Sequence, residues 1–221
     1  MYQILEKREL AEGIFLMRVH APRVAQAALP GQFVIVRTDE FAERIPLTIA
    51  DFDREEGSVT IIYQIVGAGT MELNSLQKGE CVHDFVGPLG VPTHTEGLKK
   101  VCIVGGGVGC AIAYPVAKKL RQQLCCVDAI IGFRTRNLVI LRDEFYLMTD
   151  DGTAGRSGLV TEMLETLFKM GKKYDEVIAI GPLPMMKYVC EVTKKYGIKT
   201  VVSMNPIMID GTGMCGGCRL T

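Results

Sequence analysis

The stretch VCIVGGGVGCAIAYPVA (residues 101–117) decides the fold class of the second half of the chain. It is apolar over most of its length, but glycines and a proline interrupt it, and Lys100 and Lys118 flank it. A membrane helix needs about 20 consecutive apolar residues, so a strand, a glycine turn and a helix explain this run better. We therefore expect no membrane partner.

The composition is typical of an intracellular globular protein. Lys+Arg and Asp+Glu are 25 each among 221 residues, so no basic excess suggests a nucleic-acid partner. The first residues, MYQILEKREL, lack the apolar core of a secretory signal, and we expect a cytoplasmic protein. Eight cysteines without an export signal argue against a disulfide framework. Most lie in apolar segments and are predicted to be small buried side chains: Cys81, Cys102, Cys110, Cys125, Cys126 and Cys190.

Two kinds of pattern divide the chain. In residues 1–97, short segments rich in Val, Ile, Phe and Tyr alternate with Gly, Pro and Asp, which predicts an antiparallel Greek-key β-barrel. Residues 98–204 alternate apolar strands with amphipathic helices, which predicts a doubly wound parallel α/β sheet. A polar linker (90–100) joins the two, and residues 205–221 form a separate segment rich in glycine and cysteine.

The turn IVGGGVG joins a predicted strand to a predicted helix. Glycines let a phosphate approach the backbone, and the helix N-terminus offers free N–H groups, so this context favours dinucleotide binding over a merely tight turn. Gly105 and Gly107 match the G-x-G-x-x-G pattern, whereas Cys110 stands in the third glycine position. The next strand ends in GFRTR, so Arg134 and Arg136 either face the 2′-phosphate of NADP or lie in a solvated loop.

Four further segments are either anion sites or ordinary structure. In VGAGTMELNSL (66–76), Thr70 is expected to cap a helix whose N–H groups can bind an anion. GPLG (87–90) and GPLPMM (181–186) are each predicted to be a turn after a strand, and such a turn binds ligands at the carboxyl edge of a parallel sheet. In RIPLTIAD, a buried Arg44 needs a carboxylate or a phosphate, while at a sheet edge it needs neither.

The order of these segments resembles the ferredoxin–NADP reductase superfamily. Within it, the chain is similar to the electron-transfer subunit of dihydroorotate dehydrogenase and its relatives. These include the small (alpha) subunit of NADH-dependent reduced ferredoxin:NADP oxidoreductase, also described as the sulfide dehydrogenase FAD/NAD-binding subunit. The likeness covers essentially the whole chain and is carried by RIPLTIAD, TDDGTAGRSGLVTEML, AIGPLPMM and VVSMNPIMIDGTGMCGGCR.

The resemblance implies two cofactor sites, one for FAD against the barrel and one for NAD(H) at the parallel sheet. The implied FAD residues are Arg44, Pro46, Leu47, Thr48, Ile62, Tyr63, Gln64, Gly69 and Thr70. The implied NAD(H) residues are Gly105, Gly106, Gly107, Gly109, Asp151, Gly181, Pro182 and Met185. One departure concerns Arg44, because a dihydroorotate-type pattern has arginine directly before the proline, where this chain has Ile45.

The segment DGTGMCGGCRLT contains part of an iron–sulfur motif. Plant-type [2Fe–2S] proteins use C-x4-C-x2-C and a distant fourth cysteine, and Asp210, Cys215 and Cys218 reproduce the first spacing. Zinc is a rival occupant because C-x-x-C also binds it, and a segment without metal is the third alternative. The resemblance implies one Asp and three Cys ligands, with the last Cys beyond residue 221. We therefore expect either a truncated chain or a cluster that is lost or completed by another residue.

With the resemblance, these residues imply an electron-transfer flavoprotein subunit. NADH would reduce FAD, and electrons would pass through a [2Fe–2S] cluster to a larger flavin and iron–sulfur subunit of a heterodimer, with ferredoxin reached indirectly. The larger subunit is alternatively a dihydroorotate dehydrogenase, a hydrogenase or a glutamate-synthase-like flavoprotein. A further hypothesis is a dinucleotide-binding module without turnover. No catalytic acid–base pair is expected, since His20, His83 and His94 are scattered along the chain.

Overall fold

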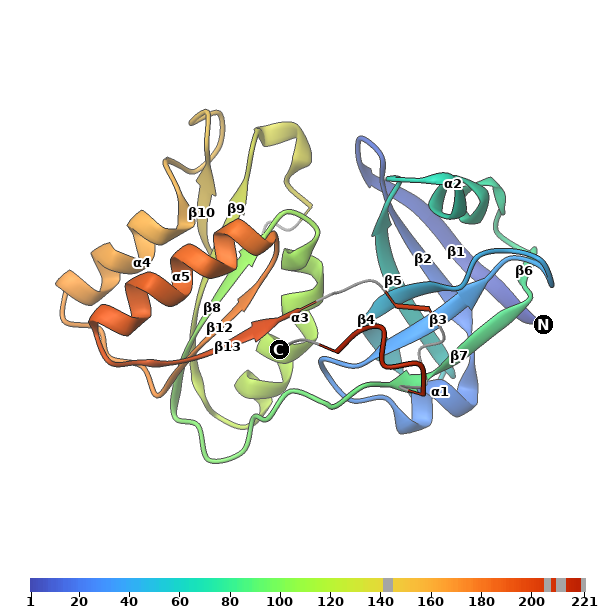
Figure 1. Cartoon of the computed structure of the whole chain (residues 1–221), viewed down its shortest axis with the longest axis horizontal. Helices are drawn as coiled ribbons and strands as arrows, with labels where there is room; N and C mark the ends of the chain where they lie inside the picture. The colour runs from blue at the N-terminus through green and yellow to red at the C-terminus, as the bar shows by residue number, and fades with distance from the viewer. Residues whose placement is uncertain (141–144, 205–207, 210–213, 220–221) are drawn as a thin grey trace. The chain divides into compact units, whose positions relative to one another are not determined.

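The computed structural model describes residues 1–140, 145–204, 208–209 and 214–219 (Figure 1). The chain forms two compact units, Met1–Thr93 with Asn205–Thr221, and His94–Met204. The first unit contains the antiparallel sheet and the second contains the parallel sheet. Among the described helices, none is both long enough and apolar enough to cross a membrane.

The first unit is a nearly closed antiparallel barrel of seven strands in the order β6-β1-β2-β5-β4-β3-β7. The end strands β6 and β7 are consecutive in the chain, and only His83 separates them. One continuous segment therefore forms both edges of the sheet, which draws the sheet into a barrel and covers edges that would otherwise be open. The strands are β1 (Tyr2–Ala11), β2 (Ile14–His20), β3 (Phe33–Arg37), β4 (Ile45–Asp53), β5 (Ser58–Gln64), β6 (Cys81–Val82) and β7 (Asp84–Leu89).

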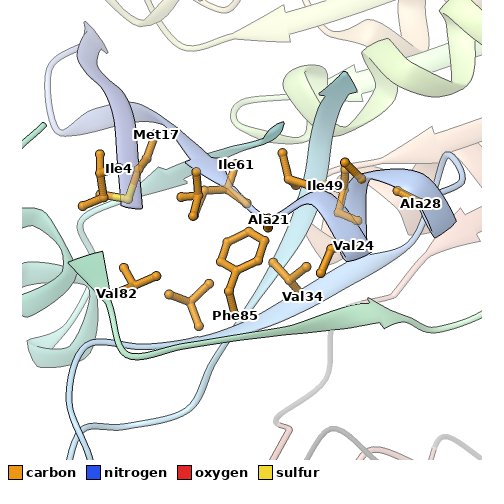
Figure 2. Packing of buried hydrophobic residues seen from close by; sticks show 14 of the residues in the cluster. Ile4, Met17, Ala21, Val24, Ala28, Val34, Ile49, Ile61, Val82 and Phe85 are labelled. Atoms are coloured by element: carbon orange, nitrogen blue, oxygen red, sulfur yellow. The ribbon is translucent and has the colours of Figure 1, made fainter. Parts of the chain in front are cut away.

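Alternate residues of these strands fill the barrel. In β5, for example, Val59, Ile61 and Tyr63 are buried, as the period-2 pattern requires. Figure 2 shows the Phe85 ring in the middle of this cluster, between Val82 and Val34. Two short helices belong to the same unit, α1 (Pro22–Ala27) and α2 (Ala68–Ser75).

The segment CVHDFVGPLG differs from its predicted form. It was expected to be one strand followed by a GPLG turn, but it forms β6 and β7, and Gly87, Pro88 and Leu89 all lie within β7. A Cβ on Gly87 would lie 2.7 Å from Val34 Cγ1. The glycine is thus explained by the close approach of β3 and β7, so the prediction of a turn there was wrong.

The second unit is a six-stranded parallel sheet in the order β11-β10-β9-β8-β12-β13. Its strands are β8 (Lys100–Gly106), β9 (Cys126–Phe133), β10 (Tyr146–Thr149), β11 (Arg156–Ser157), β12 (Glu176–Ile180) and β13 (Lys199–Ser203). Its helices are α3 (Gly109–Gln122), η1 (Arg136–Leu138), α4 (Val160–Lys169) and α5 (Leu183–Lys195).

Helices cover both faces of this sheet. Figure 1 shows α4 and α5 together on one face and α3 on the other. Val104 of β8 packs in one cluster with Leu164 and Val189, whereas Ile103 packs in another with Leu120. Burial on both faces explains why these strands are continuous apolar runs, and it confirms the predicted doubly wound sheet.

The cysteine prediction was correct only in part. Cys102, Cys110 and Cys125 are buried, and Cys81 and Cys190 are half-buried. Cys126 is exposed, because it is the first residue of β9 and lies at the amino end of the strand, beyond the helices that cover its middle.

The C-terminus of α3 holds a non-glycine residue in the left-handed region. Leu124 has a φ of 62°, and Cys125 N–H donates to Leu120 O at 3.0 Å while Leu124 N–H donates to Arg121 O at 3.0 Å. This is the Schellman arrangement, in which the left-handed residue is usually glycine. The Leu124 side chain is 95% exposed, so it gains almost no packing in exchange for the strained backbone.

Leu124→Gly should therefore raise the free energy of unfolding by about 0.5–1 kcal/mol, because it removes the left-handed strain of an L-residue. Urea denaturation measures the change. Gln123→Gly is the matched control, since Gln123 has a φ of −88° and should lose stability instead. A destabilised Leu124→Gly protein would contradict this account of the helix end.

A charged cluster ties β9 to the loop before β12. Asp128 accepts hydrogen bonds from Lys172 Nζ at 2.9 Å and from Tyr174 Oη at 2.7 Å. Burial acts to raise the pKa of Asp128, but these hydrogen bonds outweigh burial, and the pKa lies below its usual value. A lowered carboxyl pKa means that the cluster stabilises the fold above the unfolded pKa of about 3.9, and that this stabilisation is lost as the pH falls further.

Asp128→Asn should lower the free energy of unfolding at pH 7 by about 1–2 kcal/mol, the usual contribution of hydrogen bonds to a charged group. The difference from the unsubstituted protein should shrink as the pH falls below about 3.9. Urea denaturation at a series of pH values tests this, with the exposed Glu191→Gln as the matched control. A difference that stayed constant across the acidic range would rule out the charge of Asp128 as its cause.

Candidate functional site

The strand order places a topological switch point between β8 and β12. The chain runs from β8 to β9 and β10 on one side, then returns to β12 on the other side of β8. In open α/β sheets, ligands bind outside the carboxyl ends of the strands at such a point. The segments that leave β8 and β12 here are the turn 105–109 and residues 181–186, both singled out from the sequence. In the second segment, here called the 181–186 loop, Gly181 and Pro182 lead into the first turn of α5.

The turn 105–109 leads directly from strand to helix. Gly107 has a φ of 56°, its N–H donates to Gly132 O at 2.9 Å, and an added Cβ would meet nothing within 4 Å. Gly109 is the first residue of α3, and a Cβ there would lie 2.4 Å from Ile180 O. Glycine is thus required at Gly109 by the packing of α3 on the end of β12, while the outer side of the turn at Gly107 is open for a phosphate to approach.

The structure brings the turn and the 181–186 loop into contact. A Cβ on Gly106 would lie 2.5 Å from Met185 Sδ and 3.1 Å from Pro182 Cδ. A Cβ on Gly181 would lie 3.0 Å from Gly106 N. The sequence suggested both segments as candidates, and the sheet topology explains why they meet.

Cys110 occupies the third glycine position as a packing residue. Its side chain is buried, and its Sγ lies 3.0 Å from where a Cβ of Gly105 would be. Burial raises the pKa of the Cys110 thiol to about 12. The thiol is therefore neutral at pH 7 and fills the space behind the turn.

Asp151 and the two arginines lie further along the same edge. The Asp151 carboxylate accepts hydrogen bonds from Thr153 Oγ1 at 2.7 Å and from Thr153 N at 3.0 Å, and these bonds hold its pKa below the usual range. Arg136 N–H donates to Thr153 Oγ1 at 2.8 Å, which joins the loops after β9 and β10. The side chains of Arg134 and Arg136 are exposed. Because β9 lies between β10 and β8, Asp151 is separated from the glycine turn by one strand.

The predicted flavin residues of the barrel lie in β4, β5 and α2, except the half-buried Arg44, which directly precedes β4. Pro46, Leu47 and Thr48 pair with β3 residues, and all three are half-buried. The Tyr63 ring is only 2% exposed and packs at 6.1 Å from the Phe15 ring inside the barrel. Burial also raises the pKa of its hydroxyl. The Tyr63 side chain belongs to the core, so only the backbone of Tyr63 is available for the predicted flavin contact. Its neighbours Ile62 and Gln64 are half-buried and exposed, respectively.

The first turn of α2 is held by Thr70 from inside the helix. The N-cap is Gly67, and Thr70 Oγ1 accepts hydrogen bonds from Val66 N–H at 2.9 Å and Gly67 N–H at 3.1 Å. Thr70 thus contributes to the cap, but from the third helical position instead of preceding the helix. A Cβ on Gly69 would lie 2.6 Å from Glu43 Oε2 and 3.2 Å from Ile45 Cδ1. The residues on both sides of Arg44 therefore contact this turn.

The tail supplies only part of the proposed metal site. Gly217 N–H donates to Cys215 Sγ at 3.4 Å, Cys215 is exposed and Cys218 is half-buried. A backbone N–H to sulfur contact is the kind of bond that tunes iron–sulfur ligands. Asp210 lies outside the described residues, and within the described part of the chain no three metal-binding side chains come together. The cluster stays a prediction.

Sequence reasoning missed two contacts of these sites. Gly132 is the penultimate residue of β9, and a Cβ there would lie 2.5 Å from Val160 Cγ1 at the start of α4. Glu43, the residue before the predicted flavin ligand Arg44, contacts the first turn of α2. A glycine near the end of an apolar strand was a usable signal for Gly132, whereas the position of Glu43 depends on how the barrel closes.

Two solved structures of low sequence identity have the same fold. Phthalate dioxygenase reductase has the same fold at 18% identity and a TM-score of 0.73, over 91% of this chain and 67% of that one. The cytochrome b5 reductase domain of Ulva prolifera nitrate reductase also has it, at 19% identity and a TM-score of 0.73, over 91% and 95% of the two chains. The two units thus form the fold of ferredoxin reductases, as the sequence predicted.

More similar proteins show the family. A chain of NADH-dependent reduced ferredoxin-NADP oxidoreductase, whose structure was reported for flavin-based electron bifurcation, is 41% identical, with a TM-score of 0.93 over 99% of this chain and 81% of that one. The dihydroorotate dehydrogenase B (NAD(+)) electron transfer subunit homolog of Thermotoga maritima is 44% identical over 99% of this chain and 79% of its own length. The electron transfer subunit of Fusobacterium nucleatum is 32% identical, over 96% and 86%.

The chain belongs to the family of dihydroorotate dehydrogenase B electron transfer subunits. It is an oxidoreductase subunit with an electron-transfer role, which confirms the family resemblance drawn from the sequence. No protein-family model matches the chain.

Gly109→Ala should lower the free energy of unfolding by about 2–3 kcal/mol, because its Cβ would meet the backbone of Ile180, which cannot rotate away. Gly107→Ala is the matched control. It enters open space at a φ of 56° and should lose only about 1 kcal/mol through its left-handed backbone. Urea denaturation compares the two, and equal losses would contradict the close packing of α3 on β12.

Proposed function

We propose that this subunit binds FAD on its barrel and NAD(H) at the carboxyl edge of its parallel sheet. Electrons would then pass to a [2Fe–2S] cluster and a larger partner subunit. The observation that carries the proposal is the contact between the glycine turn after β8 and the 181–186 loop after β12 at the switch point. Two loops that meet at this edge, one of them with an open helix N-terminus, suit a dinucleotide pyrophosphate.

The barrel residues fit FAD in a corresponding way. The first turn of α2 presents backbone N–H groups, and Arg44 lies between two residues that contact that turn. An arginine beside a helix N-terminus is suited to a pyrophosphate, because both contribute positive charge and N–H donors. Leu47 and Thr48 of β4 and Ile62 and Gln64 of β5 would contact the flavin along the barrel surface.

Bound FAD would supply the redox chemistry, since it accepts two electrons as a hydride and passes electrons on singly. The chain's own residues bind and orient. Gly105, Gly106, Gly107 and Gly109 would let the backbone approach the dinucleotide phosphates, and Pro182 and Met185 would close over it from the β12 side. No side chain is assigned a proton-transfer role.

The tail and the partner complete the proposal. Cys215 and Cys218, with Asp210 and one further cysteine, would hold the [2Fe–2S] cluster, because thiolates suit iron and a carboxylate would shift its potential. The relatives are named as electron transfer subunits, which supports a larger partner subunit in a heterodimer. Ferredoxin would then be an indirect partner.

The preference between NADH and NADPH depends on the loops after β9 and β10. The ionised Asp151 would accept a hydrogen bond from a ribose hydroxyl and repel a 2′-phosphate, whereas Arg134 and Arg136 would attract that phosphate. The dihydroorotate dehydrogenase B relatives are named for NAD(+) alone, which supports NADH as the donor, whereas the oxidoreductase is named for both NADH and NADP.

The protein reconstituted with FAD should lose its flavin absorbance rapidly when mixed with NADH under anaerobic conditions in a stopped-flow instrument. NADPH should act more slowly. Dithionite is the control, because it bleaches any bound flavin whether or not a dinucleotide site exists. A flavin that dithionite bleaches and NADH leaves unchanged would refute the proposal. NADH binding without any flavin binding would instead favour the dinucleotide module without turnover.

A further inference from the structure

The turn between β3 and β4, residues 38–44, exposes an aromatic side chain. Phe41 is 90% exposed, more than any other aromatic side chain among the described residues. Its sequence neighbours are polar or small, and neither the barrel core nor the proposed flavin contacts use it. An exposed apolar side chain on a well-ordered turn is a candidate contact for a ligand or a partner.

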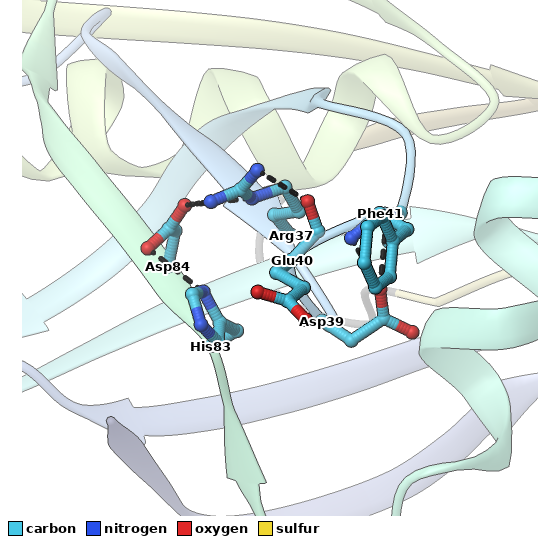
Figure 3. Close-up of polar contacts among 7 residues, drawn as sticks. Arg37, Asp39, Glu40, Phe41, His83 and Asp84 are labelled. Atoms are coloured by element: carbon cyan, nitrogen blue, oxygen red, sulfur yellow. Dashed lines mark hydrogen bonds and ion pairs between the residues drawn. The ribbon is translucent and has the colours of Figure 1, made fainter.

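The turn that holds Phe41 is braced (Figure 3). Asp39 Oδ1 accepts hydrogen bonds from Phe41 N–H at 2.7 Å and Ala42 N–H at 2.9 Å. Arg37 donates to Glu40 O at 2.9 Å and, through Nε, to Asp84 Oδ2 at 2.7 Å. These bonds join the turn to β7 and fix the backbone on both sides of the ring.

The same turn contacts α2 at two places, once in its first turn and once just after it. Thr38 Oγ1 donates a hydrogen bond to Glu72, and Glu43 Oε2 lies 2.6 Å from the position of a Gly69 Cβ. Phe41 lies between these two contacts in the chain. Two residues separate Phe41 from Arg44, so their Cα atoms are at most about 11 Å apart.

Two further apolar side chains flank the start of α2. Val66 precedes the N-cap and Met71 is the fourth helical residue, the pair that often packs together as a hydrophobic staple. Here they are 79% and 61% exposed. Phe41, Val66 and Met71 therefore leave exposed apolar surface on the two segments that form the candidate pyrophosphate site.

We propose that Phe41, with Val66 and Met71, forms a platform for the adenine ring of FAD. The inference rests on the proposed function, because it places the FAD pyrophosphate at the first turn of α2. The adenosine is covalently joined to that pyrophosphate and must leave the site over a neighbouring surface. A phenyl ring on a braced backbone has few rotatable bonds, so it stacks a purine with little loss of entropy on binding. The exposed Glu40 beside it suits the exocyclic amino group of adenine, which is a hydrogen-bond donor.

The size of the surface favours a purine over a protein partner. A stable protein interface buries about 800 Å² and many residues on each partner. This platform consists of only three side chains, and the exposed carboxylates of Asp39 and Glu40 lie next to Phe41 in the chain. A purine ring is similar in size to the Phe41 ring with the apolar side chains of Val66 and Met71.

The test compares FAD with FMN, which lacks the adenosine. Phe41→Ala should weaken FAD binding about tenfold in ultrafiltration, which corresponds to about 1.4 kcal/mol and lies within the range for stacking of one base on an aromatic ring. FMN binding should not change. Phe41→Tyr keeps the ring and should retain FAD affinity. Because Phe41 is 90% exposed, the urea midpoint should be the same in all three proteins.

Unchanged FAD affinity in Phe41→Ala would overturn the platform and leave the flavin proposal intact. Equal losses for FAD and FMN would also overturn it, because the effect would then not involve the adenosine. Unchanged FAD affinity combined with weaker binding of a copurifying subunit would assign the ring to a protein contact instead. If the unsubstituted protein bound neither FAD nor FMN, the proposed function itself would fail.

Discussion

The close packing of α3 against the end of β12 is the constraint on which the parallel-sheet unit depends. Because Gly109 lies against the Ile180 carbonyl, the helix starts immediately after β8 and its N-terminus opens at the edge of the sheet. A side chain at this position would push the helix away and move those N–H groups. The same closeness brings Gly106 against Met185, so one steric requirement positions both loops at the switch point.

The barrel depends on a different constraint, the continuity of its two edge strands. Since β6 and β7 are one segment interrupted only at His83, the sheet cannot open without breaking either the β6–β1 pairs or the β7–β3 pairs. Arg37 adds an ion pair to Asp84 across β3 and β7 and also supports the β3–β4 turn. The closure of the barrel and the placing of the turn against α2 are therefore linked through Arg37.

The sequence was sufficient for the parts of the molecule that follow local patterns. The alternation of apolar strands with amphipathic helices, together with the GGGVG turn, predicted the doubly wound sheet. A continuous apolar strand is expected in a sheet that helices cover on both faces, and an amphipathic helix is expected to be one of those covering helices. Local patterns were insufficient where contacts between distant segments decide. The sequence predicted a turn at Gly87 because the residue that contacts it, Val34, is far away in the sequence. It predicted a buried Cys126 because the sequence does not show where along β9 the covering helices end. The Tyr63 ring and the exposure of Phe41 likewise depend on barrel closure.

Cys110 gives the glycine turn an unusual chemical property. The thiolate is the form of cysteine that reacts with peroxides and alkylating reagents, and burial raises the pKa of this thiol to about 12, so almost none of it is ionised at neutral pH. The sulfur that packs behind the glycine turn is thus chemically inert. Cys126, exposed at the amino end of β9, lies at the opposite edge of the same sheet. A thiol-directed fluorophore would therefore react with exposed thiols such as Cys126 and Cys215 and leave Cys110 unmodified.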